Sequence, residues 1–358
     1  LYGKPMLVSG HGTSTLNPWR YEESILTATL AGLQDWDALF SDQWAASLES
    51  SIASQPVRFV DIAVDPTRLA TERIAALTFL RRDQAPAPQA LSDVVSIADI
   101  TAVANDAVGS GFPEMAWVTR VGRRISGTAT TLPPAGVNEV RLTGANSAVA
   151  IDRMLDENRL PAANKTNLET DSRHSETNQV FLDGAMGTFR LITPRTIIGI
   201  APETETLRFG AVSALFGDCD AMFWITSLDN QPVAKSTRLL LAHVTDVQNT
   251  GARFYSSERK VLEDLGTGPL LARHGRITVE LDRAGAPRSV EVWRLDNSGQ
   301  RTSPVVTSVN ANLIRFTGDN RGPDGKAVVY YEILVRDSPA PQPIKPPAKA
   351  KKLTFSRR

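Results

Sequence analysis

Several features that would mark a specialised protein are missing from this chain of 358 residues. It has one cysteine, Cys219, which excludes an internal disulfide, and no Cys/His cluster has the spacing of a zinc site. Because 39 basic residues balance 39 acidic ones, no bulk charge attracts nucleic acid or anionic lipid. We therefore expect no nucleic-acid partner, no metal and no cofactor.

Long apolar runs and aromatic residues are also scarce. No run reaches the roughly 18–20 residues of a membrane helix, so we expect no membrane span. Aromatic residues form 6% of the chain, which counts mildly against a large platform of stacking side chains. The hydrophobic fraction of 42% is nevertheless typical of a globular protein. The length fits about two or three domains.

The first 85 residues alternate short apolar runs with helical patterns, which predicts a parallel α/β structure. Two strands cannot make a sheet that is covered on both faces, so they need further strands. The chain also starts without Met and directly before a strand, and we expect it to be the C-terminal part of a larger protein. The expected elements are a strand at 6–9, a helix capped by Asn17, a strand at 38–40, and a helix that is capped by Asp65 and ends at Arg81 and Arg82.

After a Pro/Ala spacer at 85–88, helical periodicity mostly disappears and short alternating segments predict β-sandwiches. We expect a β-sandwich over 86–265, a smaller immunoglobulin-like sandwich over 266–338, and a disordered Pro/Lys tail over 339–358. The predicted strands are 137–142, 179–182, 188–192, 207–211, 222–227, 238–246, 276–281, 290–295, 313–317 and 327–334.

Several short motifs, taken in order, carry a family resemblance. They are 3–9 (GKPMLVS), 33–40 (LQDWDALF), 61–66 (DIAVDP), 79–82 (FLRR), 193–196 (TPRT), 236–241 (STRLLL), 249–251 (NTG) and 266–269 (GTGP). Together they resemble the C-terminal part of clan A retaining glycoside hydrolases, in a bacterial group whose (β/α)8 (TIM) barrel is followed by β-sandwiches. The resemblance implies that residues 1–85 are the last strand–helix units of a barrel. It also implies a polysaccharide or oligosaccharide ligand and an extracytoplasmic (periplasmic or secreted) location.

The resemblance places the catalytic nucleophile at a position that holds glycine here. In that family a Glu follows the seventh strand and works with an acid/base Glu about 5 Å away. This sequence reads Ser9-Gly10-His11 at the same point, and the strand that would bring the acid/base Glu is not in the chain. Three explanations stay open: an inactive relative that binds glycans, another carboxylate such as Asp42 or Glu22, or a different register.

Four residues near the expected strand ends are candidates for carbohydrate binding: His11, Trp19, Asp42 and Trp44. Each has a plain alternative, because His11 and Asp42 could be solvated surface groups and the two tryptophans could be structural. The alternative functions are a non-catalytic glycan-binding module and a purely structural β-sandwich. The residues leave the oligomeric state open.

Overall fold

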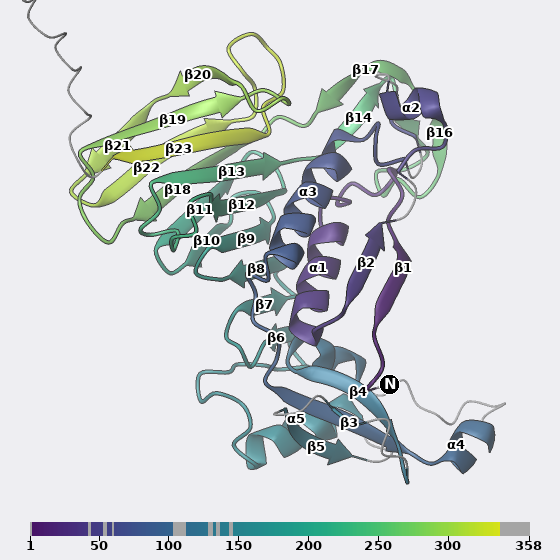
Figure 1. Cartoon of the computed structure of the whole chain (residues 1–358). Coiled ribbons are helices and arrows are strands. Elements are labelled where there is room, and N and C mark those ends of the chain that lie inside the picture. Colours follow the sequence, from purple (N-terminus) through teal and green to yellow (C-terminus); the bar gives the residue numbers. More distant parts are fainter. Residues whose placement is uncertain are drawn as a thin grey trace, which may run out of the picture.

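The computed structural model describes residues 2–41, 44–52, 56–58, 61–102, 112–127, 132–133, 137–142 and 146–336 (Figure 1). A small parallel α/β region at the N-terminus is followed by a second parallel sheet and then by large antiparallel sheets. Figure 1 shows the antiparallel sheets at left, helices α1 and α3 in the middle, and the β1–β2 sheet at right. The expected tail at 339–358 lies outside the described residues.

The N-terminal region has the predicted alternation of strand and helix. Strands β1 (Leu7–His11) and β2 (Ala38–Ser41) pair in parallel, and α1 (Glu23–Gln34) connects them. A short helix, α2 (Leu48–Ile52), leads on to α3 (Pro66–Leu80), which packs along α1. The described residues do not form a barrel, because β1 and β2 make a sheet of their own.

The sequence predicts caps at the starts of two helices, and the structure confirms one of them and corrects the other. Asp65 caps α3 as predicted, since its side chain accepts a hydrogen bond from the Thr67 backbone N–H at 3.0 Å. Asn17 likewise accepts from the Trp19 N–H at 2.9 Å, but the next residues form separate turns and α1 begins only at Glu23. Asn17 therefore stabilises a local turn before the helix, and the prediction that it caps the helix itself is wrong.

The region expected to open a β-sandwich is instead a second parallel sheet. Its strands, in the order β4-β3-β5, are β4 (Arg120–Ile125), β3 (Gln89–Val95) and β5 (Asn138–Leu142). Helices α4 (Ile97–Ala102) and α5 (Ser147–Asp156) and the 3₁₀ helix η1 (Pro113–Trp117) accompany it. The prediction missed β3 because this strand is buried on both faces and so shows no alternation of apolar and polar residues.

Two antiparallel sheets then form a sandwich, and all ten predicted strands are present in this part of the chain or in the parallel sheet before it. The nine-stranded sheet contains, in spatial order, β20 (Arg301–Val305), β19 (Ser289–Leu295), β23 (Tyr330–Arg336), β13 (Arg238–Val244), β12 (Ala221–Ser227), β9 (Thr196–Ala201), β8 (Thr188–Ile192), β7 (Val180–Asp183) and β6 (Ser172–His174). The five-stranded sheet contains β10 (Thr206–Phe209), β11 (Val212–Gly217), β18 (Arg276–Asp282), β22 (Leu313–Asp319) and β21 (Thr307–Asn310).

The expected boundary at 266–269 does not separate two sandwiches. Strand β18 pairs with β11 and strand β23 pairs with β13, so segments from both sides of the boundary share both sheets. The segment around the boundary belongs to an arm of two small hairpin sheets, in which β14 (Val247–Thr250) pairs with β17 (Thr267–Ala272) and β15 (Arg253–Phe254) with β16 (Leu262–Asp264). Alternation predicts a strand but not its partner, which is why the boundary was misplaced.

The described residues contain three hydrophobic cores, of which one lies in the second parallel sheet and two hold the sandwich and the helices together. One of these two fills the space between the two antiparallel sheets and includes Phe209, Phe223 and Tyr331. The other lies between the outer face of the nine-stranded sheet, where Trp224 is buried, and helices α1 and α3. The helices therefore cover the sandwich on one side and the β1–β2 sheet on the other, which fixes the strand ends of the α/β region against the sandwich.

Replacing Gly199 in β9 by alanine is expected to destabilise the sandwich by about 1–3 kcal/mol. A Cβ atom at this position would lie 2.4 Å from Cζ of Phe209 and 3.1 Å from Cδ1 of Leu207, so the strand or the ring has to move. The measurement is the urea midpoint of unfolding. The matched control is Gly285→Ala, where a Cβ meets nothing within 4 Å, and equal midpoints for both variants would contradict the prediction.

Candidate functional site

A polar cluster lies where β1 and β2 end at their carboxyl termini. We define the His11 cluster as His11, Glu23, Ser41 and Glu72. The cluster forms because β1 contains a β-bulge: Val8 faces Leu39 and His11 faces Ser41, so two residues of β1 oppose one residue of β2. The extra residue brings His11 beside Ser41 and toward the helices.

The hydrogen bonds of the cluster connect His11 to both carboxylates. Ser41 donates to Glu72, and its oxygen lies 3.3 Å from Nε2 of His11. Nδ1 of His11 lies 2.8 Å from Oε1 of Glu23, and a carboxylate can only accept. Nδ1 of His11 therefore donates to Glu23, and Ser41 connects the other ring nitrogen with the Glu72 carboxylate.

The pKa shifts agree with this arrangement. The hydrogen bond to Glu23 is the main cause that raises the pKa of His11, with burial acting against it and the charges of Glu23 and Glu72 adding to it. Burial would by itself raise the pKa of Glu23, but the bond and the charge of His11 outweigh it and hold that pKa below its ordinary value. The His11 side chain is 10% exposed, so this pair is only weakly screened by water.

A second group of side chains lies where α1 approaches the sandwich. Trp19 is 50% exposed, and its Nε1 donates to Oδ2 of Asp220, in the loop between β11 and β12, at 3.2 Å. Glu22 follows one turn later, with its N–H bonded to the Trp19 carbonyl at 2.9 Å. Burial, and secondarily the charge of Asp220, raise the pKa of Glu22 to about 7. Within the described part of the chain, no hydrogen bond or ion pair to the Glu22 carboxylate is present.

The other predicted site residues are placed separately. Trp44 is 58% exposed, so it does not belong to the core, and its carbonyl accepts from the Ala63 N–H at 2.9 Å. Gly10 lies within the bulge of β1, and Asp42 lies outside the described residues. The structure thus gathers His11 with Glu23 and Glu72, and Trp19 with Asp220, but it does not join the four predicted binding residues in one site.

The sequence patterns do not point to four residues of these two groups, which are Glu23, Ser41, Glu72 and Asp220. Glu23 could have been found, because it directly follows the loop from β1 and opens the next helix at the same edge of the sheet. Glu72 lies within α3, in a pattern that suits a solvated helix face equally well. Asp220 comes from the sandwich, and no local signal connects it with Trp19, 201 residues earlier.

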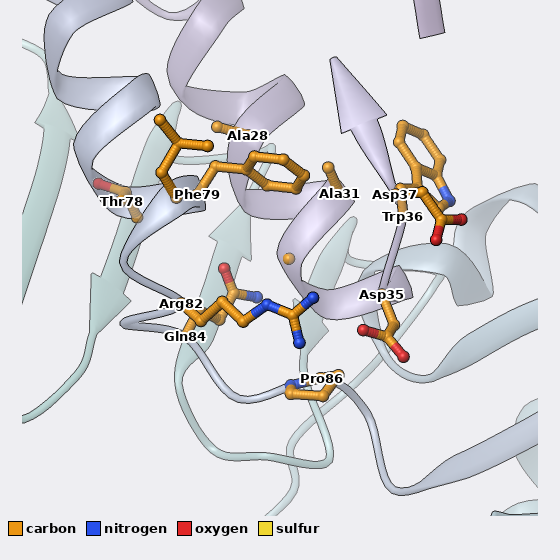
Figure 2. A pocket seen from close by; sticks show the side chains of 12 residues that line it. Ala28, Ala31, Asp35, Trp36, Asp37, Thr78, Phe79, Arg82, Gln84 and Pro86 are labelled. Atoms are coloured by element: carbon orange, nitrogen blue, oxygen red, sulfur yellow. The ribbon is translucent and has the colours of Figure 1, made fainter. Parts of the chain in front are cut away.

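A cavity of about 160 Å³ lies at the opposite end of α1 and α3 (Figure 2). Figure 2 shows Phe79, Arg82 and Pro86 around it, with Ala31 of α1 on one side. It adjoins the C-terminal ends of both helices and hence the amino ends of β1 and β2. In parallel α/β structures the chemistry lies at the carboxyl ends of the strands, so the strand ends near His11 are the better candidate site.

Comparison with known proteins leaves the family unassigned: no family model matches the chain, and no curated protein matches it. None of the described helices is long and apolar enough to cross a membrane.

Proposed function

We propose that this chain is a carbohydrate-binding protein of the clan A (β/α)8-barrel lineage in which the catalytic nucleophile is replaced by Gly10. The observation that carries the proposal is the half-exposed indole of Trp19, whose Nε1 is held by Asp220 where α1 approaches the sandwich. An indole with one fixed edge and a free face suits stacking on a sugar ring. Trp44, 58% exposed just after β2, offers a second such face.

The β1–β2 sheet supports a barrel lineage because one of its faces is packed against the core while the other exposes apolar side chains. Leu39 packs against the core under α1 and α3, whereas Leu7 and Phe40 are 53% and 55% exposed. In a closed (β/α)8 barrel the face away from the helices is the filled interior, where such apolar side chains would be covered. We place the glycan outside the cytoplasm, as a polysaccharide or oligosaccharide, because the proteins that the sequence resembles act there.

A binding role is favoured over hydrolysis by the carboxylates near the strand ends. Glycoside hydrolysis takes two carboxyl groups with separate roles. Gly10 has no side chain, and Glu23 and Glu72 are engaged by His11 and Ser41. Hydrolysis is the second candidate function because Glu22 has a pKa of about 7, which suits a general acid, and Asp220 is the charge beside it.

The test is a glycan array followed by calorimetric titration of the ligand that binds. Trp19→Ala and Trp44→Ala are each expected to weaken binding about tenfold, because each removes a stacking face worth roughly 1–1.5 kcal/mol. Tyr255→Ala is the matched control, since Tyr255 is 78% exposed on the β15–β16 arm.

Hydrolysis is screened in parallel with the wild type, Gly10→Glu and Glu22→Gln. For a binding protein we expect that the wild type does not hydrolyse the glycan. This expectation holds whether or not Gly10→Glu gains hydrolytic activity. Turnover by the wild type that Glu22→Gln abolishes would establish the second candidate function instead. A chain that binds no glycan, or that binds equally well without either tryptophan, would overturn the proposal.

A further inference from the structure

We propose that His11, Glu23 and Glu72 form a binding site for one divalent transition-metal ion, of the class of Zn²⁺, Co²⁺ or Mn²⁺. One ligand atom from each residue can be chosen so that all three lie within 4.8 Å of one another. Two ligands that bind one metal at about 2.0–2.2 Å lie about 3 Å apart in tetrahedral or octahedral geometry. The 2.8 Å between Nδ1 of His11 and Oε1 of Glu23 already matches this separation.

The three ligands come from three elements whose positions are fixed by packing. His11 ends β1, Glu23 opens α1 and Glu72 lies in the second turn of α3. Helices α1 and α3 pack against each other through the core that contains Ile25 and Ile74. A site built on packed helices and a strand end needs little rearrangement when an ion enters.

Hydroxyl groups around the cluster orient the carboxylates as supporting groups do in metal sites. Ser24 donates to Oε1 of Glu72 at 2.7 Å and also lies 3.2 Å from Oε2 of Glu23. Thr27 donates to Oε1 of Glu23 at 3.3 Å. These contacts hold both carboxylates within the cluster through the shared hydroxyl of Ser24, and Ser41 supplies a further oxygen at its edge.

Charge favours a cation in this position. Glu23 and Glu72 bring two negative charges to His11. The guanidinium of Arg68 also faces His11 and Glu23, so the cluster keeps one net negative charge when His11 is neutral. A metal ion would displace a proton from His11, and its binding should therefore tighten as pH rises. An imidazole ligand selects transition metals over Ca²⁺ and Mg²⁺, which take oxygen ligands.

The site goes beyond what the sequence predicts, because its ligands are far apart in the chain and lack any zinc-motif spacing. It is also independent of carbohydrate binding at Trp19 and Trp44. Protein that binds metal but no glycan would leave this inference intact, and the reverse result would leave the carbohydrate proposal intact.

The experiment is a calorimetric titration of chelator-treated full chain with ZnCl₂, repeated with MnCl₂ and CaCl₂. We expect one ion of Zn²⁺ or Mn²⁺ per chain, and at least tenfold weaker binding of Ca²⁺. Proton release on binding should make the observed binding enthalpy vary with the ionisation enthalpy of the buffer. His11→Gln and Glu72→Gln should each weaken Zn²⁺ binding at least about tenfold. His274→Gln, which removes an exposed histidine paired with Asp319, is the matched control and should bind as the wild type does.

A second measurement keeps the inference testable if a variant does not fold. The visible spectrum of the Co²⁺ form of the wild type should show nitrogen and oxygen ligands and lack the thiolate charge-transfer band that Cys219 would give. No saturable binding of any of these ions, equal binding by the folded His11→Gln variant, or a thiolate band would each overturn the site.

Discussion

Replacing Arg20 by methionine is expected to lower the free energy of unfolding by about 3–5 kcal/mol. Nε of Arg20 donates to Oδ2 of Asp65 at 2.6 Å, and Nη1 donates to Oδ1 of Asp246 at 2.7 Å, while the guanidinium is fully buried. Methionine would leave the buried Asp65 carboxylate without its cation, and that uncompensated charge is the main cost. The free energy is measured by urea unfolding followed by tryptophan fluorescence.

The effect is large because Arg20 joins three parts of the molecule. Asp65 is the cap of α3, Asp246 follows β13 of the sandwich, and Nη2 of Arg20 also donates to the Val247 carbonyl at 2.6 Å. Arg253→Met is the control, since its pair with Asp264 is 69% and 50% exposed and should contribute no more than about 1 kcal/mol. Similar losses in the two variants would mean that the buried network adds nothing specific.

Replacing Glu22 by glutamine is expected to stabilise the protein at about pH 8 by roughly 3 kcal/mol and to have little effect near pH 4. Burial and the charge of Asp220 raise the pKa of Glu22 from its ordinary 4.5 to about 7. In the unfolded chain Glu22 loses its proton near its ordinary pKa of 4.5, whereas in the folded chain it does so only near pH 7. Between these two pH values the folded state therefore binds more protons than the unfolded state. Wild-type stability therefore falls as pH rises through this window, and it stays lower above it.

Glutamine removes the penalty because it is never ionised. Urea unfolding of the wild type and of Glu22→Gln at about pH 4, 6 and 8 should show a gap that widens with pH. Glu258→Gln, a change at a 64% exposed side chain, serves as the control at about pH 8 and should shift stability by less than about 0.5 kcal/mol. A constant gap, or a gap that narrows with rising pH, would show that Glu22 is not held in its protonated form.

Features that depend on neighbouring residues were predictable from the sequence. Asp65 followed by Pro66 predicts the start of α3 because the cap bond spans two residues. Alternation of apolar and polar residues, as in β22 (Leu313–Asp319), predicts strands because successive side chains face opposite sides of a sheet. The parallel β1–α1–β2 unit follows from the same local patterns, and His11 was a candidate because it ends the first strand.

Features that depend on distant residues were decided by the tertiary structure. Strand β3 is covered on both faces, so burial removed the pattern by which a strand is recognised. The sandwich strands from both sides of 266–269 share their sheets because pairing partners are selected by packing across the core, which no local pattern encodes. The His11 cluster combines both kinds of feature, because the sequence alone already places His11 at the end of a strand. Only the packing of α1 and α3 brought Glu23 and Glu72 to it, since side chains far apart in the chain meet only when hydrophobic faces bury each other.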